Sequence, residues 1–87
     1  MSSRKLAWTD EAWKDYLYWQ SQDKKTLKRI KKLIQSTQNQ PFIDIGKPES
    51  LRANLSGFWS RRIDDTNRLV YAVDDEYLTT IACRYHY

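Results

Sequence analysis

Apolar side chains recur at helical spacing soon after the start of the chain. The pattern is carried by Ala12, Trp13, Tyr16, Leu17 and Trp19. Thr9 suits the N-cap position, and Asp10 and Glu11 follow it in the first turn, where the helix dipole favours acidic groups. The spacing therefore predicts a helix over about residues 10–21.

A second helical pattern follows almost at once. Asp23 is a suitable N-cap for it, and its apolar stripe consists of Leu27, Ile30, Leu33 and Ile34. The opposite face is basic and carries Lys24, Lys25, Lys28, Arg29, Lys31 and Lys32. Because few residues separate the two helices, we expect a helical hairpin. The apolar residues 6–8 ahead of it are a candidate first strand.

Beyond the helices the pattern changes to alternation. Residues 38–50 contain both prolines and Gly46, so we expect a loop there. Strands are predicted over residues 51–55, 58–63, 68–73 and 77–85, with turns at 56–57, 64–67 and 74–76. Consecutive strands joined by short turns form an antiparallel meander. The chain is therefore expected to be α+β, with two N-terminal helices packed on a twisted antiparallel β-sheet.

The last three strands separate apolar from polar residues by the parity of their numbers. The odd positions are mostly apolar, with Arg61 and Thr79 as exceptions: Trp59, Ile63, Leu69, Tyr71, Val73, Ile81, Cys83 and Tyr85. Side chains alternate between the faces of a strand, and parity stays in phase across a hairpin loop with an odd number of residues. With three-residue loops at 64–66 and 74–76, the odd face would pack on the helices. The even face would then expose Arg62, Arg68, Arg84 and His86 together, unless a two-residue loop without a bulge breaks the register.

Length and composition limit the class of protein. The chain has 87 residues, 40% of them hydrophobic, so residues 1–87 are expected to form a single domain. We expect the four tryptophans and Cys83 to lie in its core. One cysteine and one histidine cannot supply the four ligands of a usual structural zinc site, so neither a metal nor a cofactor is expected. No apolar run approaches the ~20 residues of a membrane span, and the simplest location is the reducing cytoplasm.

The charge balance favours an anionic partner. Lys and Arg number 15 against 11 Asp and Glu, which gives a net charge of +4. Nucleic acid, the ribosome, an acidic protein and a membrane surface all remain candidates on charge alone. Three arginines on one exposed sheet face would repel each other, so an anion among them is a natural explanation. Arginine is also the better residue for bidentate contact with phosphate.

Cleavage of an RNA phosphodiester without a metal is one reaction that residues of these types can serve. The reaction needs a base for the 2′-hydroxyl, cations for the charge that gathers on phosphorus, and an acid for the departing 5′-oxygen. Glu49 is a candidate base, and Arg68 with Arg62 can hold the phosphorane. His86 is the one side chain here with an ordinary pKa near neutrality, so it is the candidate acid. Tyr85 or Tyr87 would stack on an unpaired base.

Each of these features also has an ordinary explanation. A lone histidine next to the end of a chain is usually solvated, and Glu49 resembles a common loop carboxylate. Arg62 and Arg68 would simply pair on the surface with Asp64, Asp65 or Asp74, and the basic helix face would be solvated. Composition and pattern alone therefore lead to an α+β domain with a basic, aromatic face.

Several segments resemble the YoeB family of toxins, within the RelE/ParE toxin superfamily. They are residues 13–20 (WKDYLYWQ), 46–49 (GKPE), 54–63 (NLSGFWSRRI), 68–73 (RLVYAV) and 82–87 (ACRYHY). The resemblance covers nearly the whole chain, and its motifs occur in the family's order. It implies a RelE-like fold and a ribosome-dependent endoribonuclease that cuts messenger RNA in the decoding site.

The resemblance also implies partners and residue roles. The partner is a YefM-like antitoxin whose disordered C-terminal segment covers the toxin, and operator DNA is reached only through that antitoxin. A homodimer through the helical side is plausible for the family. Glu49 matches the general base, His86 the general acid, Arg68 the transition-state cation and Tyr87 the substrate-positioning tyrosine. The resemblance places a phosphate-contacting arginine at Arg62 and a basic substrate-binding residue at Arg52, where the best-known member of the family has a lysine. Arg84 is expected to bind substrate because parity puts it on the same face, and Lys28, Arg29 and Lys32 of the basic helix are expected to face rRNA.

Two other functions are compatible with parts of the pattern. ParE-like members of the superfamily inhibit DNA gyrase and perform no RNA chemistry. Against that reading, an inhibitor has no need to keep Glu49, Arg68, His86 and Tyr87 together. A DNA-binding regulator using the basic helix is disfavoured, because the sequence contains no helix-turn-helix pattern with its turn glycine.

Overall fold

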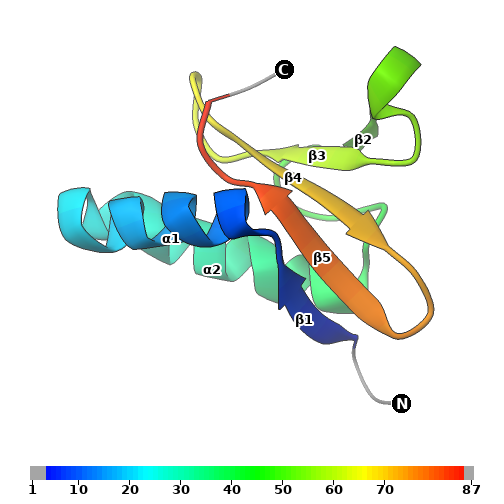
Figure 1. Ribbon diagram of the computed structural model, residues 1–87, viewed down its shortest axis with the longest axis horizontal. Helices are drawn as coiled ribbons and strands as arrows, with labels where there is room; N and C mark the ends of the chain where they lie inside the picture. Colours follow the sequence, from blue (N-terminus) through cyan, green and yellow to red (C-terminus); the bar gives the residue numbers. More distant parts are fainter. Residues whose placement is uncertain (1–3, 86–87) are drawn as a thin grey trace.

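The computed structural model describes residues 4–85. Strand β1 (Lys5–Trp8) leads into helices α1 (Asp10–Gln22) and α2 (Lys24–Asn39). The rest of the sheet comprises β2 (Glu49–Ser50), β3 (Trp59–Arg62), β4 (Arg68–Val73) and β5 (Tyr77–Ala82), with a short 3₁₀ helix at Ala53–Leu55. In Figure 1 the two helices lie one in front of the other on the same side of the molecule, next to the twisted sheet. No helix within residues 4–85 is long and apolar enough to cross a membrane.

The predicted caps define both helices. The Thr9 hydroxyl accepts a hydrogen bond from the Ala12 N–H at 3.0 Å. The Asp23 carboxylate accepts from the N–H groups of Lys25 and Thr26, each at 3.1 Å. Because Asp23 is the single residue between α1 and α2, the chain reverses there, and the predicted helical hairpin is confirmed.

The core forms where α2 faces the sheet. All four predicted apolar residues of α2 are buried, and they pack with Leu69, Tyr71, Leu78 and Cys83. The expectation that all tryptophans are core is wrong. Trp19 is buried, Trp8 and Trp59 are half-buried, and Trp13 is 47% exposed. The buried stripe of α1 consists of Ala12, Asp15 and Trp19, which leaves Trp13 on the flank of the helix.

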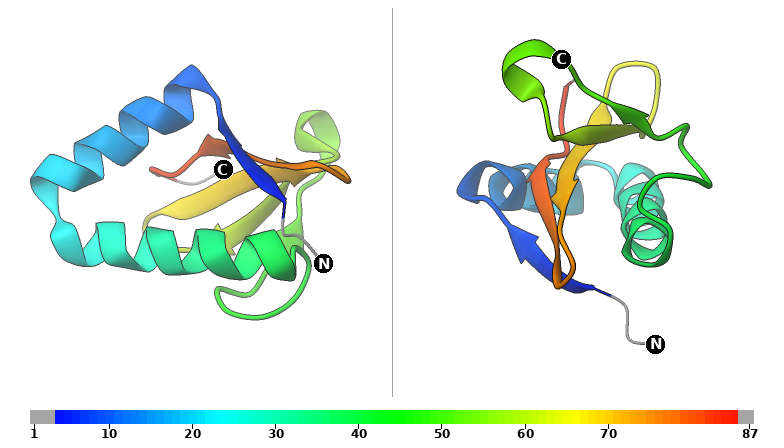
Figure 2. Two further views of the ribbon diagram at one scale, coloured as in Figure 1. Left: turned by 90° about the horizontal axis from the view of Figure 1, so that it is seen from below. Right: turned by 90° about the vertical axis from the view of Figure 1, so that its right-hand side faces the viewer.

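The α+β class and the two packed helices are confirmed, but the sheet is mixed rather than wholly antiparallel. Its order is β1-β5-β4-β3-β2, and β2 to β5 pair antiparallel as a meander. Strand β1 pairs with β5 in parallel. It runs parallel because the helical hairpin and the meander separate it from β5, so no tight turn dictates its direction. The two views in Figure 2 show β1 lying along the β5 edge of the sheet.

Two predicted strands differ from the observed ones. Residues 51–55 were expected to be a strand, but they begin the turn from β2 back to β3. The Leu51 N–H donates to the Phe58 carbonyl at 2.9 Å, and Ala53 adopts a left-handed φ of 58°. The last strand ends at Ala82 rather than residue 85, because the backbone of Cys83 bonds to side chains of α1.

In β3 and β4 the odd-numbered residues face the core as predicted, although even-numbered Ser60 and Val70 are buried as well, and the parity prediction is wrong for most of β5. The 64–66 loop has three residues, since Ile63 N–H donates to Asn67 O and Arg62 pairs with Arg68. The second hairpin has a two-residue tip instead, closed by Asp74 N–H to Tyr77 O. Even-numbered Leu78 and Thr80 are therefore buried, and Ile81 is only half-buried.

A bulge in β5 restores the predicted phase. Tyr71 pairs with Thr80 and Val70 pairs with Ala82, so Ile81 has no partner in β4. Beyond this bulge the odd-numbered Cys83 is back in the core. After Ile81, odd-numbered residues therefore face the core again, as predicted. This end of β5 lies beside the start of β4.

Candidate active site

An open recess of about 240 Å³ is lined by Lys47, Glu49, Arg62 and Arg68. Three of these residues were predicted from the sequence as base and phosphate-binding groups. The recess is smaller than a usual small-molecule pocket and is lined by charge. It is better suited to a phosphate of a longer chain than to an enclosed ligand.

The strand register brings the three predicted residues to one face. Glu49 pairs with Ser60 across β2 and β3, and Arg62 pairs with Arg68 across β3 and β4. Directly opposed residues share a face, and so do residues two apart on one strand. Glu49, Arg62 and Arg68 therefore lie together on the face that parity assigned to even numbers.

Arg68 and Glu49 form an ion pair. Arg68 Nη1 lies 2.9 Å from Glu49 Oε1, with the two side chains 28% and 59% exposed. The alternative that Arg68 pairs with Asp64, Asp65 or Asp74 is wrong. Such an exposed pair adds little to stability, so its importance is where it places the carboxylate. Glu49 thus lies in the short strand β2, exposed to solvent and paired with Arg68.

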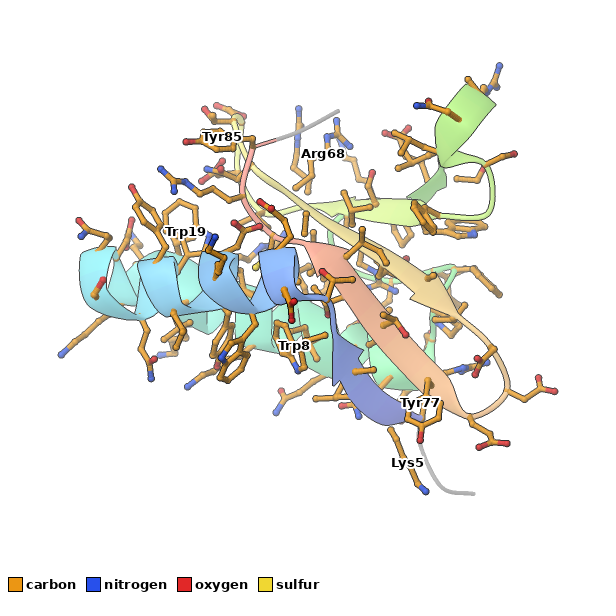
Figure 3. The ribbon with its side chains drawn as sticks, in the orientation of Figure 1. Lys5, Trp8, Trp19, Arg68, Tyr77 and Tyr85 are labelled. Carbon is orange, nitrogen blue, oxygen red and sulfur yellow. The ribbon has the colours of Figure 1, made fainter. Side chains whose placement is uncertain are left out.

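The C-terminal segment is anchored beside Arg68. The Arg68 N–H donates to the Tyr85 carbonyl at 2.8 Å, and the Tyr85 N–H donates to Asn67 Oδ1 at 2.7 Å. Tyr85 adopts a left-handed φ of 63°, which these two bonds hold in place. Figure 3 shows Arg68 and Tyr85 at the same end of the sheet, away from Lys5 and Tyr77. The predicted acid His86 and the predicted Tyr87 lie outside the described residues.

Two predicted substrate-binding arginines do not line the recess. The Arg84 guanidinium lies 3.5 Å from the centre of the Tyr18 ring and 4.7 Å from that of Tyr85. The strand has ended by this point, so Arg84 follows the turn of the chain toward α1 instead of the sheet face. Arg52 precedes the 3₁₀ helix and is exposed. It is displaced because residues 51–55 turn instead of continuing as a strand.

One residue of the recess was not among the predicted site residues. Lys47 lines the recess and adopts a left-handed φ of 50°. Its position two residues before Glu49 could have indicated this role, because a basic side chain there adds to the positive charge of Arg62 and Arg68. Within residues 4–85, no three His, Cys, Asp or Glu side chains gather as potential metal ligands.

The basic face of α2 is a second charged surface, with lining residues distinct from those of the recess. Lys28, Arg29 and Lys32 line a shallow depression together with Lys25, Lys31 and Gln35. Arg29 Nη2 donates to the Arg62 carbonyl at 3.2 Å, so the helix and β3 are joined next to the site. The predicted rRNA-facing residues therefore form a basic surface on α2, and one of them, Arg29, contacts the main chain of β3 at Arg62.

Burial controls the ionisation of two groups between α1 and the end of β5. Burial, and then the nearby Asp15 charge, raises the pKa of the Cys83 thiol to about 12, so it is not a reactive thiolate. Burial also raises the pKa of Asp15, although the hydrogen bond from the Cys83 N–H opposes that effect. Cys83 is fully buried, which confirms its expected role as a packing residue.

Comparisons with known proteins agree with this architecture. Residues 8–87 match the profile of the YoeB-like toxins of bacterial type II toxin–antitoxin systems. Toxin YoeB of Escherichia coli strain K12 is 59% identical over 83 residues, which are 95% of this chain and 99% of that protein. A YoeB dimer from Staphylococcus aureus superimposes with a TM-score of 0.91 at 42% identity, covering 99% of this chain and all of that one. The YoeB–YefM complex from the same organism gives a TM-score of 0.88 at 41% identity, with 99% and 100% covered.

Proposed function

The chain belongs to the YoeB-like toxins of bacterial type II toxin–antitoxin systems, and we propose that it is a ribosome-dependent endoribonuclease. It cuts messenger RNA in the decoding site without a metal or a cofactor. Because it acts on ribosomes, its place of action is the cytoplasm. The observation that carries this proposal is the contact between a carboxylate and a guanidinium, Glu49 and Arg68, in a recess lined by two further cations.

Glu49 and Arg68 supply the first half of the reaction. Glu49 accepts the proton of the 2′-hydroxyl, whose oxygen then attacks the adjacent phosphorus. Arg68 and Arg62 hold the negative charge that develops on the phosphorane oxygens. At rest, Arg68 is bonded to Glu49 itself. An arriving phosphate competes for this guanidinium, so binding of substrate releases the carboxylate to act as a base.

The C-terminal segment supplies the second half. The bond from phosphorus to the 5′-oxygen breaks, and His86 donates a proton to that oxygen, which leaves a 2′,3′-cyclic phosphate on the upstream fragment. Tyr87 stacks on or positions the base. Support comes from Tyr85, the last described residue, whose carbonyl is bonded to the Arg68 N–H. Arg52 and Arg84 contact more distant parts of the RNA rather than the reacting phosphate.

Macromolecular contacts follow from the surfaces. Lys28, Arg29 and Lys32 contact rRNA phosphates without sequence preference. A YefM-like antitoxin binds the toxin, which reaches operator DNA only through it. The free toxin forms a homodimer through its helical side, where Trp13 is exposed and stacks on Tyr16 at 5.7 Å.

The proposed activity is tested on ribosomes programmed with a defined messenger RNA, with cleavage mapped by primer extension. Wild type should cut in the decoding site. Glu49→Gln and His86→Gln should each slow cleavage by roughly 10²–10⁴-fold. Glu76→Gln is the matched control, because Glu76 is an exposed carboxylate in the opposite hairpin turn. Cleavage should persist when EDTA is added to pre-assembled complexes.

Three results would contradict the proposal. Equal activity in Glu49→Gln and wild type would remove Glu49 as the base. Strict dependence on an added metal would contradict the metal-free mechanism. A folded wild type that leaves both messenger RNA and translation intact would favour gyrase inhibition, which a supercoiling assay would then detect.

A further inference from the structure

We propose that the buried Arg61 is a positioning residue for Glu49. It holds the loop that delivers Glu49 to the recess, although it lies on the opposite face of β3 and lines no part of that recess. This inference rests on the proposed role of Glu49 as the base. It assigns a function to a residue that the alternating pattern marked only as an exception among apolar positions.

The Arg61 guanidinium uses all of its donors inside the protein. Arg61 is fully buried. Its Nε donates to the Tyr71 hydroxyl at 3.3 Å, and Nη1 donates to Ser36 Oγ at 2.7 Å and to the Ile45 carbonyl at 2.9 Å. Its Nη2 donates to the carbonyls of Gln40 and Ile43. These are all five N–H groups that a guanidinium has.

Most of these bonds end on one segment, residues 40–45. Three of its carbonyls accept from Arg61, and a fourth, that of Pro41, accepts from the Tyr71 hydroxyl at 2.6 Å. Ser36, which also accepts from Arg61, donates to the Asp44 carboxylate at 2.8 Å. A buried charge without such partners would be strongly unfavourable. The guanidinium and this segment therefore require each other.

The segment would not keep its shape unaided. Asp44, Gly46 and Lys47 all adopt left-handed backbone conformations, with φ of 91°, 83° and 50°. Such conformations are costly for residues other than glycine and persist only where surrounding contacts impose them. At Gly46 a side chain is also excluded, because an added Cβ would lie 2.8 Å from the Leu33 side chain. Arg61 supplies the contacts that hold this path.

The path leads directly to Glu49, whose other contacts are the exposed ion pair with Arg68 and a short strand pairing. Strand β2 has only two residues, and both are exposed. Its pairing with β3 is correspondingly short. Gly46 adds one further link, since its carbonyl accepts from the Arg62 N–H at 2.7 Å. Neighbouring arginines of β3 thus act on opposite faces: Arg61 fixes the incoming loop, and Arg62 lines the recess.

Arg61→Lys is the informative variant, because lysine keeps the charge but cannot reach five acceptors in a fixed plane. We expect single-turnover cleavage on programmed ribosomes to fall by about 10²-fold, the usual cost of small misplacement of a catalytic group. Ribosome affinity should stay within about twofold. Hydrogen exchange of residues 40–48 should accelerate while that of β4 remains protected.

A double variant separates positioning from general stability. If Arg61 acts through Glu49, adding Arg61→Lys to Glu49→Gln should slow cleavage by less than about threefold beyond Glu49→Gln alone. Ile34→Val is the matched control, because it weakens the core while leaving every hydrogen bond of Arg61 in place, and its cleavage rate should equal that of wild type. Should Arg61→Lys fail to fold, Tyr71→Phe removes one donor to the same segment. It should reduce cleavage several-fold and show the same lack of additivity.

The outcomes distinguish this inference from the function on which it rests. A harmless Glu49→Gln would overturn both. If Glu49→Gln slows cleavage and Arg61→Lys cleaves at the wild-type rate, only the positioning role of Arg61 is overturned. Fully multiplicative losses in the double variant would overturn it too, because Arg61 would then act by another route.

Discussion

The Asp15 carboxylate on α1 accepts a hydrogen bond from the Cys83 N–H at 3.0 Å, across 68 residues of chain. From the same helix, Trp19 Nε1 donates to the Cys83 carbonyl at 2.8 Å. Both backbone groups of Cys83 are thereby fixed by α1 rather than by the sheet. The end of β5, and with it the start of the C-terminal segment, is set by the first helix.

Removing the acceptor at residue 15 should destabilise the protein. Asp15→Ala leaves the buried Cys83 N–H unpaired, which costs about 1–3 kcal/mol in the free energy of unfolding. Asp15→Asn keeps an acceptor oxygen and avoids the burial of a charge, so its stability at pH 7 should equal or exceed that of wild type. Urea unfolding of the three proteins measures this, and equal losses in both variants would contradict it.

The stability of the fold should decrease in acid. Hydrogen bonds from Thr26 and Tyr77 lower the pKa values of Asp23 and Asp74 from 3.8. For Asp64, burial raises the pKa, but hydrogen bonds from Thr66 and Asn67 outweigh it, so the pKa is lowered. Groups with lowered pKa values stabilise the fold above their unfolded pKa, and that stabilisation is lost as pH falls through the folded values.

The acid dependence can be assigned to these three carboxylates by substitution. Replacing Asp23, Asp64 and Asp74 by Asn should flatten the pH dependence of stability below about pH 4. Asp15 contributes to the pH dependence of stability with the opposite sign, because burial raises its pKa. Its protonation in acid removes the cost of burying its charge and so stabilises the fold. If the triple variant keeps the wild-type pH dependence of stability, other titratable groups are responsible for the loss of stability in acid.

Loss of the Arg68 guanidinium should affect chemistry more than binding. Arg68→Ala should slow cleavage on the ribosome by roughly 10²–10³-fold, by analogy with the loss of one oxyanion-hole donor. Arg68→Lys should recover only part of this, because an ammonium cannot make the bidentate contact. Arg4→Lys is a suitable control, since Arg4 binds the Asp74 carbonyl at the other end of the sheet. A loss below tenfold in Arg68→Ala would point to a different cation.

The basic face of α2 should determine the salt dependence of ribosome binding. Reversing Lys28, Arg29 and Lys32 to Glu should weaken binding and reduce the slope of log affinity against log salt by about one for each lost phosphate contact. Lys5→Glu with Lys14→Glu, away from this face, should change the slope far less. Filter binding at several salt concentrations would measure both, and an unchanged slope in the triple variant would exclude this surface.

The exposed Trp13 should be required for the proposed homodimer but not for folding. It stacks on Tyr16 and meets Trp8 edge-on at 5.6 Å, yet 47% of it is exposed. Trp13→Ser should therefore yield a folded monomer in analytical ultracentrifugation at concentrations where wild type is dimeric. Phe42→Ser, which changes an exposed aromatic residue on the 40–45 loop, should remain dimeric. Persistence of the Trp13→Ser dimer would place the interface elsewhere.

Local signals in the sequence predicted the helices and much of the sheet. The caps at Thr9 and Asp23 and the stripe of α2 depend on neighbouring residues, so pattern alone was sufficient. Strand β4 was predicted with its observed bounds, because turn residues limit it on both sides. Glu49, Arg62 and Arg68 were predicted to act together, and the register places them on one face.

The errors arise where distant contacts decide the local structure. Trp13 has the spacing of a core residue, but Asp15 occupies the buried stripe because the Cys83 backbone needs an acceptor. Arg84 has the parity of the basic face, but it stacks on Tyr18 once the strand has ended. The buried role of Arg61 depends on carbonyls of residues 40–45, which no alternation in β3 reveals.

The unpaired Ile81 has a consequence for insertions and deletions in this chain. Before Ile81, β5 faces the helices with its even residues, and after it the odd-numbered Cys83 does so. Deletion of one residue at the bulge would leave the hairpin turn and most of the buried strand unchanged. Every later residue would then present its side chain to the opposite face of the sheet. Deletion of a single residue at the bulge can therefore inactivate the protein by displacing the residues that follow Ala82, while the rest of the chain still folds. Toxicity could be lost in this way without any substitution at the recess.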